Sequence, residues 1–232
     1  VYDEREQYLL MREAFRDKTL LADLTASYDF GGVELTSITS YINRDILVSR
    51  DASALTHSVS VDLGLPIEVT SIPSNLRDTT DLKTWTQEIR IASTNDSPFQ
   101  WLVGGFYSDV ERIYAQRLPT PGYDAFVDEF FLIPVAGVTS ADLANGFPAD
   151  SPYNADLPYD IQQKAVFGEA SYDFGQFKLT AGARYYDFEE ERDFVSGGVF
   201  SNVDTRIADK TSSTGISPRL IATWEPNRNL SV

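Results

Sequence analysis

The sequence contains no cysteine and a single histidine, His57. Without cysteine the chain can form no disulfide and no thiolate site for a metal or a nucleophile. One histidine is too few for a multi-histidine metal site, and we do not expect His57 to centre a catalytic triad. We therefore expect no metal, no cofactor and no catalytic site, and we expect His57 to be an exposed loop residue.

Basic residues are also scarce. The chain has 19 lysines and arginines against 35 aspartates and glutamates, which gives a net charge of −16. Nucleic-acid-binding surfaces need clustered positive charge, so this balance argues against a nucleic-acid partner. We expect most of the acidic excess to lie on solvated faces and loops.

Long apolar runs are absent. The longest, at 131–138, has about eight residues, well short of the roughly 18 that a membrane-spanning helix needs. Residues 1–10 are too charged for a signal peptide. Because the first residue is not Met and the last four, NLSV, resemble the start of a strand, we expect 1–232 to be part of a longer protein, incomplete at both ends.

A hexapeptide, ASYDFG, occurs twice, at 26–31 and at 170–175. Around the second copy, apolar and polar residues alternate on both sides of Gly175 and Gln176, which is the pattern of a β-hairpin with a two-residue turn. In that hairpin the numbers of opposed residues sum to 351. This register brings opposite charges together: Asp173 with Lys178, Lys164 with Asp187 and, diagonally, Glu169 with Arg184.

The first copy predicts a similar hairpin, with its turn at 30–33 and opposed residue numbers that sum to 63. Lys18 then faces Asp45. Asp29 faces Glu34, a like-charge pair that is tolerable only if the turn is well hydrated.

The two faces of these hairpins differ in chemistry. The apolar face of the second hairpin begins with aromatic residues beside the turn and ends at Tyr185, and Lys164 and Asp187 lie just beyond it. The nine residues from Phe177 to Tyr185 cover about 27 Å at ~3.4 Å each, and a tilt of roughly 40° brings this height near the ~25 Å apolar band of an outer-membrane barrel. A soluble sandwich would bury the same face in a core. The aromatic ends and the flanking charges favour lipid on one side and water on the other.

Further segments alternate similarly: 85–93, 216–224 and, less cleanly, 99–116. With the two hairpins they make seven strands, and the last residues of the chain start an eighth. The short connections GG, TNDSP, GQ and EPNRN alternate with long polar ones, at about 44–82, 117–160 and 188–211. This alternation of short turns and long loops is typical of a transmembrane β-barrel.

Four segments resemble strands of TonB-dependent outer-membrane receptors, in the same order and at similar spacing: 34–46, 84–109, 165–189 and 215–224. The resemblance covers most of 19–232. It implies an all-β fold in which 1–232 form an antiparallel portion, about seven or eight strands, of a transmembrane barrel of about 22 strands. It also implies short periplasmic turns and long extracellular loops. Two hallmarks of such receptors, the N-terminal plug and the segment that contacts TonB, are not found in these residues.

The resemblance implies a receptor in the outer membrane of a Gram-negative bacterium, surrounded by membrane lipid. Such a receptor binds a scarce ligand, for example a ferric siderophore, and imports it with energy supplied by the TonB complex. Two alternatives remain open: a passive porin or structural barrel without energy coupling, and a soluble all-β enzyme or binding module. The sequence contains no catalytic constellation, so we do not expect an enzyme.

Two groups of residues are candidates for function. On the polar face we expect a charged ladder in the water-filled lumen, hydrated or in contact with the plug: Glu88, Arg90, Glu169 and Arg184. In the second long loop, aromatic residues are expected either to pack the loop or to line an extracellular ligand mouth: Tyr114, Tyr123, Phe126, Phe130 and Phe131. The i, i+4 spacing of Phe126 and Phe130 predicts a short helix there.

Acidic clusters at 189–191 and at Asp124, Asp128 and Glu129 lack the ligand spacing of a calcium loop. Consecutive glutamates on a strand point to opposite faces, so those at 189–191 cannot converge on one ion. We interpret both clusters as solvated charge.

Overall fold

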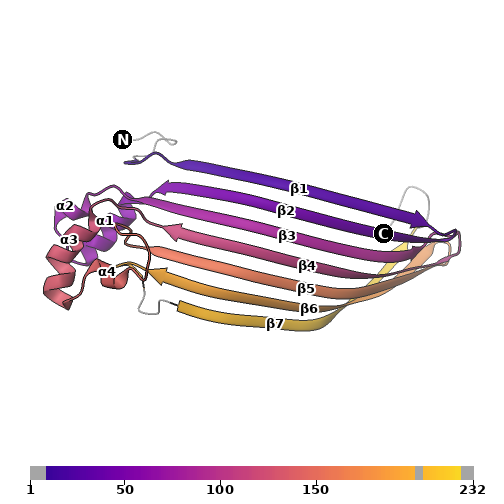
Figure 1. Cartoon of the computed structure of the whole chain (residues 1–232). Coiled ribbons are helices and arrows are strands. Elements are labelled where there is room, and N and C mark those ends of the chain that lie inside the picture. Colours follow the sequence, from indigo (N-terminus) through magenta and orange to yellow (C-terminus); the bar gives the residue numbers. More distant parts are fainter. Residues whose placement is uncertain (1–8, 202–205, 226–232) are drawn as a thin grey trace.

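The computed structural model describes residues 9–201 and 206–225 as one antiparallel sheet with a group of short helices at one end (Figure 1). The seven strands lie side by side in chain order. Their bounds are β1 (Ala14–Asp29), β2 (Val33–Asp51), β3 (Asn75–Ser93), β4 (Phe99–Arg117), β5 (Asn154–Asp173), β6 (Phe177–Gly197) and β7 (Arg206–Trp224). The all-β antiparallel fold expected from the sequence is confirmed, and the eighth strand and the turn EPNRN fall largely on residues outside the described ones.

The register predicted from both hairpins is confirmed. Lys18 lies opposite Asp45 in β1 and β2, and Lys164 lies opposite Asp187 in β5 and β6. The tight turns carry glycine in the left-handed region, with φ of 97° at Gly175, where a side chain would be strained.

The two hexapeptides share a detail of turn chemistry. The Asp173 carboxylate accepts a hydrogen bond from the backbone N–H of Gly175 at 2.7 Å, and the Asp29 carboxylate accepts one from Gly31 at 2.7 Å. An aspartate that binds the backbone two residues on stabilises a turn. This bond gives Asp29 a partner of its own and explains how it tolerates Glu34 on the opposite strand.

The strands are longer than the sequence pattern indicated. Residues placed in the long loops, including 44–51, 75–82 and 188–197, continue the strands, so the connections shorten to 52–74, 118–153 and 198–205. Tyr114, placed in the second long loop, lies on β4. The prediction was wrong here because alternation of apolar and polar residues marks a strand only where one face is apolar. Beyond that zone the backbone ladder continues with polar residues on both faces.

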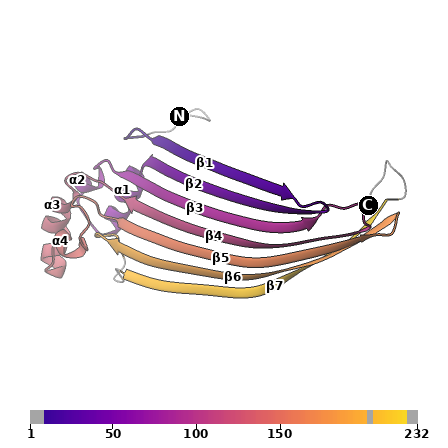
Figure 2. The same ribbon diagram turned by 45° about the vertical axis from the view of Figure 1, so that its right-hand side comes forward.

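The two longer connections fold into a helical cap over the ends of the strands, which both views show at the end opposite the tight turns (Figures 1 and 2). Its elements are α1 (Ser53–Asp62), α2 (Ile67–Thr70), α3 (Tyr123–Val127), the π-helix η1 (Asp128–Ala136) and α4 (Ser140–Leu143). The predicted short helix around Phe126 is confirmed by α3 and η1. The cap has a small buried core of Leu65, Tyr123, Val127 and Leu132.

No second layer covers the sheet among the described residues, whose buried apolar side chains are few and lie mainly in the cap. Large apolar side chains stand exposed instead, with 68% of Leu24 and 75% of Leu220 accessible. A soluble sandwich would bury such side chains, so this arrangement disfavours that reading and requires an apolar environment against one face.

Candidate functional site

The register gives the sheet one apolar and one charged face, because successive side chains of a strand point to opposite sides. The apolar face carries large exposed residues: Leu20, Leu24, Leu35, Ile89, Val103, Val166, Leu179 and Leu220. The opposite face carries Glu88, Arg90, Glu169 and Arg184 together. All four line one hollow of about 460 Å³, together with Arg219 and Phe167.

Glu169 and Arg219 form the ion pair of this hollow, with 3.0 Å between the carboxylate and the guanidinium. They lie on β5 and β7, with β6 between them. The residue of β6 opposite both is Gly182. A Cβ at Gly182 would stand only 3.0 Å from the carbonyl oxygen of Gly168 and 3.2 Å from Cβ of Glu169. The missing side chain therefore lets the pair form across an intervening strand.

Arg184 does not pair with Glu169, which corrects the contact expected from their diagonal positions. Its guanidinium carbon lies 5.2 Å from the ring centre of Phe106 instead, in a cation–π arrangement. The Glu169 carboxylate is occupied by Arg219. Glu88 and Arg90, two residues apart on β3, approach each other at 3.4 Å.

Nearer the cap, the charged face holds a second polar cluster around Asp78. Its carboxylate is almost fully buried and binds the Arg50 guanidinium. It also accepts hydrogen bonds from the Tyr114 hydroxyl at 3.1 Å and from the Gln116 amide at 2.8 Å. Tyr114 is thus part of a closed hydrogen-bond network, which is expensive to break because Asp78 is buried.

Arg112 lies beside this cluster and stacks on two tyrosines. Its guanidinium carbon is 5.8 Å from the ring centre of Tyr114 and 5.5 Å from that of Tyr159. No carboxylate among the described residues lies within ion-pair distance of Arg112 or of Arg184. Both therefore present a cation held by aromatic rings on the charged face.

The cap separates the sequence-predicted aromatic residues into two groups. Tyr123 is fully buried, its hydroxyl 2.9 Å from that of Ser60, and Phe131 packs against the same core. Phe126 and Phe130 are 36% and 47% exposed, and their rings stack at 6.4 Å. The structure thus brings Phe126 and Phe130 together on the cap surface and directs Tyr123 inward.

The cap is strongly anionic. The connections 52–74 and 118–153 contain seven acidic residues and no lysine or arginine. Burial raises the pKa of Asp124, and the nearby carboxylates of Asp150 and Asp128 add to the rise. The backbone N–H of Thr139 and its hydroxyl, both bonded to Asp142 at 2.8 Å, lower the pKa of Asp142.

Within the described parts of the chain, no helix is long and apolar enough to cross a membrane. The same residues contain no group of three or more histidine, aspartate or glutamate side chains placed to hold a metal ion. His57 is exposed, as expected, but it lies on α1.

The profile of a protein family described as TonB dependent receptor-like, beta-barrel matches residues 2–232. The chain belongs to this family. No curated protein is significantly similar to it in sequence. The sheet of this TonB-dependent receptor-like chain, one face apolar and the other charged, is that of a barrel wall.

Solved structures share the fold at low sequence identity. The ferric yersiniabactin uptake receptor FyuA of Yersinia pestis matches with a TM-score of 0.62 and 10% identity, over 93% of this chain and 27% of its own. The siderophore receptor PiuA of Acinetobacter baumannii gives 0.57 and 13%, over 93% and 31%. The ferric citrate transporter FecA gives 0.58 and 12%, over 93% and 26%. The chain thus spans under a third of the length of these receptors.

Sequence reasoning missed two residues of the charged face. Arg219 was not connected to Glu169, although the row Glu169, Gly182, Arg219 follows once the register of β7 is known. Arg112 was passed over because its partners are aromatic rings rather than a carboxylate. Alternation along β4 and β5 could have placed Arg112 and Tyr159 on one face.

Proposed function

We propose that this chain is the wall of an outer-membrane receptor of a Gram-negative bacterium that binds a scarce ligand, such as a ferric siderophore, and imports it with energy supplied by TonB. The observation that carries the proposal is the family match over residues 2–232 on a sheet whose two faces are apolar and charged. The apolar face would contact membrane lipid and the charged face would line the lumen. The tight turns would then lie in the periplasm and the cap outside the cell.

The charged face suits passage of a hydrated ligand. Several of its charges are paired within the wall, as in Glu169 with Arg219, and these pairs do not form a field of one sign. Among the described residues, Arg112 and Arg184 are the two cations that contact aromatic rings without a carboxylate partner, and their donors are free for ligand oxygens or for the plug. We assign Glu88, Arg90, Glu169 and Arg184 to the lumen surface that contacts water or the plug.

The cap supplies the first surface that a ligand meets. Phe126 and Phe130 present a stacked apolar pair that can hold the apolar part of a ligand. The acidic charge of the cap disfavours a ligand of net negative charge at long range. The charge of the cap therefore favours a neutral or cationic chelate as the ligand. Tyr123 and Phe131 would act indirectly, by holding the cap in shape.

The test is iron uptake by cells that carry the full-length gene. A strain that lacks the gene and the same strain complemented with it are supplied with radioactive iron. The iron is bound in hydroxamate or citrate chelates that differ in net charge: positive, zero or negative. The proposal predicts saturable uptake of the neutral or cationic chelate that depends on the gene. Equal uptake in both strains for every chelate would contradict the proposal that the ligand is an iron chelate.

A further inference from the structure

Three arginines lie in one row across the charged face of the sheet, on the half nearer the cap. The register sets Arg44 of β2, Arg112 of β4 and Arg192 of β6 level with one another. Leu82 of β3 and Tyr159 of β5 fill the positions between them. Because neighbouring strands are about 4.8 Å apart, successive arginines of the row are separated by roughly 10 Å. The charged face thus carries a line of guanidinium groups on the strands that lead to the anionic cap.

The two outer arginines of the row are neutralised by aspartates. Arg44 donates from Nε to the Asp17 carboxylate at 2.9 Å, and Arg192 binds the Asp209 carboxylate at 2.6 Å. The middle arginine, Arg112, faces a leucine on one neighbouring strand and a tyrosine on the other. No carboxylate of the described residues lies within ion-pair distance of it. Arg112 is therefore the one member of the row whose charge is not balanced by a described carboxylate.

Two tyrosines hold the Arg112 side chain in place. Its guanidinium carbon lies 5.8 Å from the ring centre of Tyr114 and 5.5 Å from that of Tyr159. The Tyr114 ring is fixed in turn, because its hydroxyl binds the buried Asp78 carboxylate at 3.1 Å. The Tyr159 hydroxyl makes no hydrogen bond with a described residue, and Arg112 itself is exposed. The rings thus orient a cation whose donors face solvent, with a free hydroxyl beside it.

Arg112 lies above the apolar band on the side of the cap. On β4 the aromatic ends of the band are Phe99 and Tyr107, and Arg112 follows Tyr107 by about 17 Å along the strand at ~3.4 Å per residue. With a tilt of roughly 40° this is a height of about 13 Å above the band. The tight turns lie at the opposite end of the sheet (Figure 1). In the proposed orientation, Arg112 therefore faces the outer part of the lumen, where a ligand arrives from outside the cell.

The arrangement fits a carboxylate better than a phosphate. A guanidinium presents two parallel N–H donors that match the two oxygens of a carboxylate. A phosphate dianion needs a second free cation, whereas Arg44 and Arg192 are roughly 10 Å away and already paired. One unpaired positive charge matches one negative charge. The Tyr159 hydroxyl supplies a further donor next to the same group.

We propose that Arg112, with Tyr114 and Tyr159, binds one carboxylate group of the imported chelate. This subsite rests on the proposed function of the chain as a receptor wall, and it names a group that the ligand must carry. The acidic cap disfavours a ligand of net negative charge at long range. Both conditions are met by a chelate that carries a carboxylate and a cationic group and whose net charge is zero or positive.

The first experiment uses the full-length receptor in detergent and takes acetate as the probe. Phenylglyoxal modifies accessible guanidinium groups, and mass spectrometry measures the rate at each arginine. We expect acetate to slow the modification of Arg112 roughly threefold relative to chloride at the same ionic strength. Tyr159→Phe keeps the ring and removes the hydroxyl, so it should reduce this protection. Arg184 contacts one ring, that of Phe106, which has no hydroxyl, and should respond less.

The second experiment measures uptake of two ferric trihydroxamate chelates of zero net charge by cells with the full-length receptor. One chelate carries a pendant carboxylate and a pendant ammonium group, and the other carries an amide instead of both. We expect a half-saturating concentration roughly tenfold lower for the carboxylate chelate. Arg112→Gln should remove this difference. Lys164→Gln removes a positive charge from the opposite face of the sheet and should leave the difference in place.

Heat-modifiable mobility in gel electrophoresis confirms that each variant is folded. Equal slowing of Arg112 and Arg184 by acetate would overturn the proposal, because it would be a general property of exposed arginines. Failure of phenylglyoxal to modify Arg112 in chloride would overturn it too, since another part of the receptor would then cover the side chain. A preference for the carboxylate chelate that survives in Arg112→Gln would assign that preference to the ammonium group and also overturn the proposal.

The two experiments separate failure of the subsite from failure of the transport function. Phenylglyoxal modification does not depend on uptake. Protection of Arg112 by acetate, combined with equal uptake of both chelates in cells with and without the gene, would support the subsite and contradict the import of iron chelates.

Discussion

Glu169 on β5 and Arg219 on β7 make an ion pair of 3.0 Å over the backbone of the strand between them. The pair is geometrically possible because Gly182 presents no side chain at the crossing. Two long side chains thus connect three strands of the wall on the face proposed to line the lumen.

Gly182→Val tests this relationship. The new side chain would collide with the Gly168 carbonyl and with Glu169, so we expect a loss of about 1–3 kcal/mol in the free energy of unfolding. Arg219→Gln, the control, removes the ion pair without crowding, and 63% of the Arg219 side chain is exposed. It should cost no more than about 1 kcal/mol. Denaturant titration of the full-length receptor measures both, and equal losses would contradict the steric role of Gly182.

The neighbouring glycines of β4 provide a matched pair. Gly104→Ala places a Cβ 2.5 Å from Phe167 and 2.9 Å from the Ile89 carbonyl oxygen, so we expect it to destabilise the receptor by about 1–3 kcal/mol. Gly105→Ala has 3.8 Å of clearance and should be neutral or stabilising by about 0.5–1 kcal/mol. Thermal unfolding in detergent compares them. A larger loss of stability from Gly105→Ala than from Gly104→Ala would contradict the assignment of the steric crowding to Gly104.

We expect substitutions of the exposed aromatic residues of the cap to affect ligand binding, and substitutions of its buried aromatic residue to affect stability. Phe126→Ala and Phe130→Ala remove exposed rings and should weaken ligand binding while the cap remains folded. Tyr123→Ala empties the buried core and should cost the cap about 3–5 kcal/mol, whereas Tyr123→Phe loses only the hydrogen bond to Ser60, about 1 kcal/mol.

Chymotrypsin is the suitable probe for cap folding, because 52–74 and 118–153 contain no site for trypsin. We expect rapid cleavage of Tyr123→Ala and protection of Phe126→Ala. Full ligand affinity in the double variant lacking Phe126 and Phe130 would remove these residues from the binding surface.

Asp124 makes the stability of the cap depend on pH. Because burial raises its pKa in the folded cap, the contribution of Asp124 is fully present below its unfolded pKa of about 3.9 and is lost as the pH rises through the folded value. Asp124→Asn should remove this loss and still accept the 2.7 Å bond from the backbone N–H of Asp150. The variant should therefore stabilise the cap against denaturant relative to the unaltered receptor at pH 7, and the gain should shrink toward pH 4. A gain that is the same at both values would exclude Asp124 as the titrating group.

The sequence predicted those parts of the fold that short turns determine. A two-residue turn fixes the register of a hairpin, and both predicted registers are found, down to Lys164 opposite Asp187. The register of β7 was beyond such reasoning because 198–205 is too long to constrain it, and the pair of Glu169 with Arg219 depends on that register.

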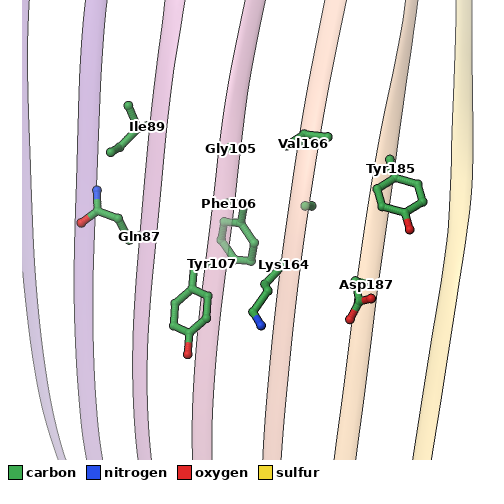
Figure 3. Close-up of a pocket in the computed structure, with 10 residues that line it drawn as sticks. Gln87, Ile89, Gly105, Phe106, Tyr107, Lys164, Val166, Tyr185 and Asp187 are labelled. Atoms are coloured by element: carbon green, nitrogen blue, oxygen red, sulfur yellow. The ribbon is translucent and has the colours of Figure 1, made fainter.

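The sequence predicted the face of the sheet on which each candidate residue of the charged face lies, but not the residues that it contacts. Alternation placed Glu88, Arg90, Glu169 and Arg184 on one face of the sheet, where they line one hollow, but contact distances depend on side chains of neighbouring strands. In the cap, the i, i+4 spacing predicted a helix at Phe126 and Phe130, yet the burial of Tyr123 depends on α1 from another connection. A hollow of about 340 Å³ on the apolar face is lined by Ile89, Gly105, Val166 and Tyr185 (Figure 3), so its shape depends on four strands at once.

The most direct test of the central claim is uptake of a radioactive ferric chelate by cells with the full-length receptor, with and without TonB. We predict saturable uptake that is lost when TonB is deleted or when the proton-motive force is abolished. Uptake that rises linearly with chelate concentration and continues without TonB would contradict active import and would identify the barrel as a passive pore.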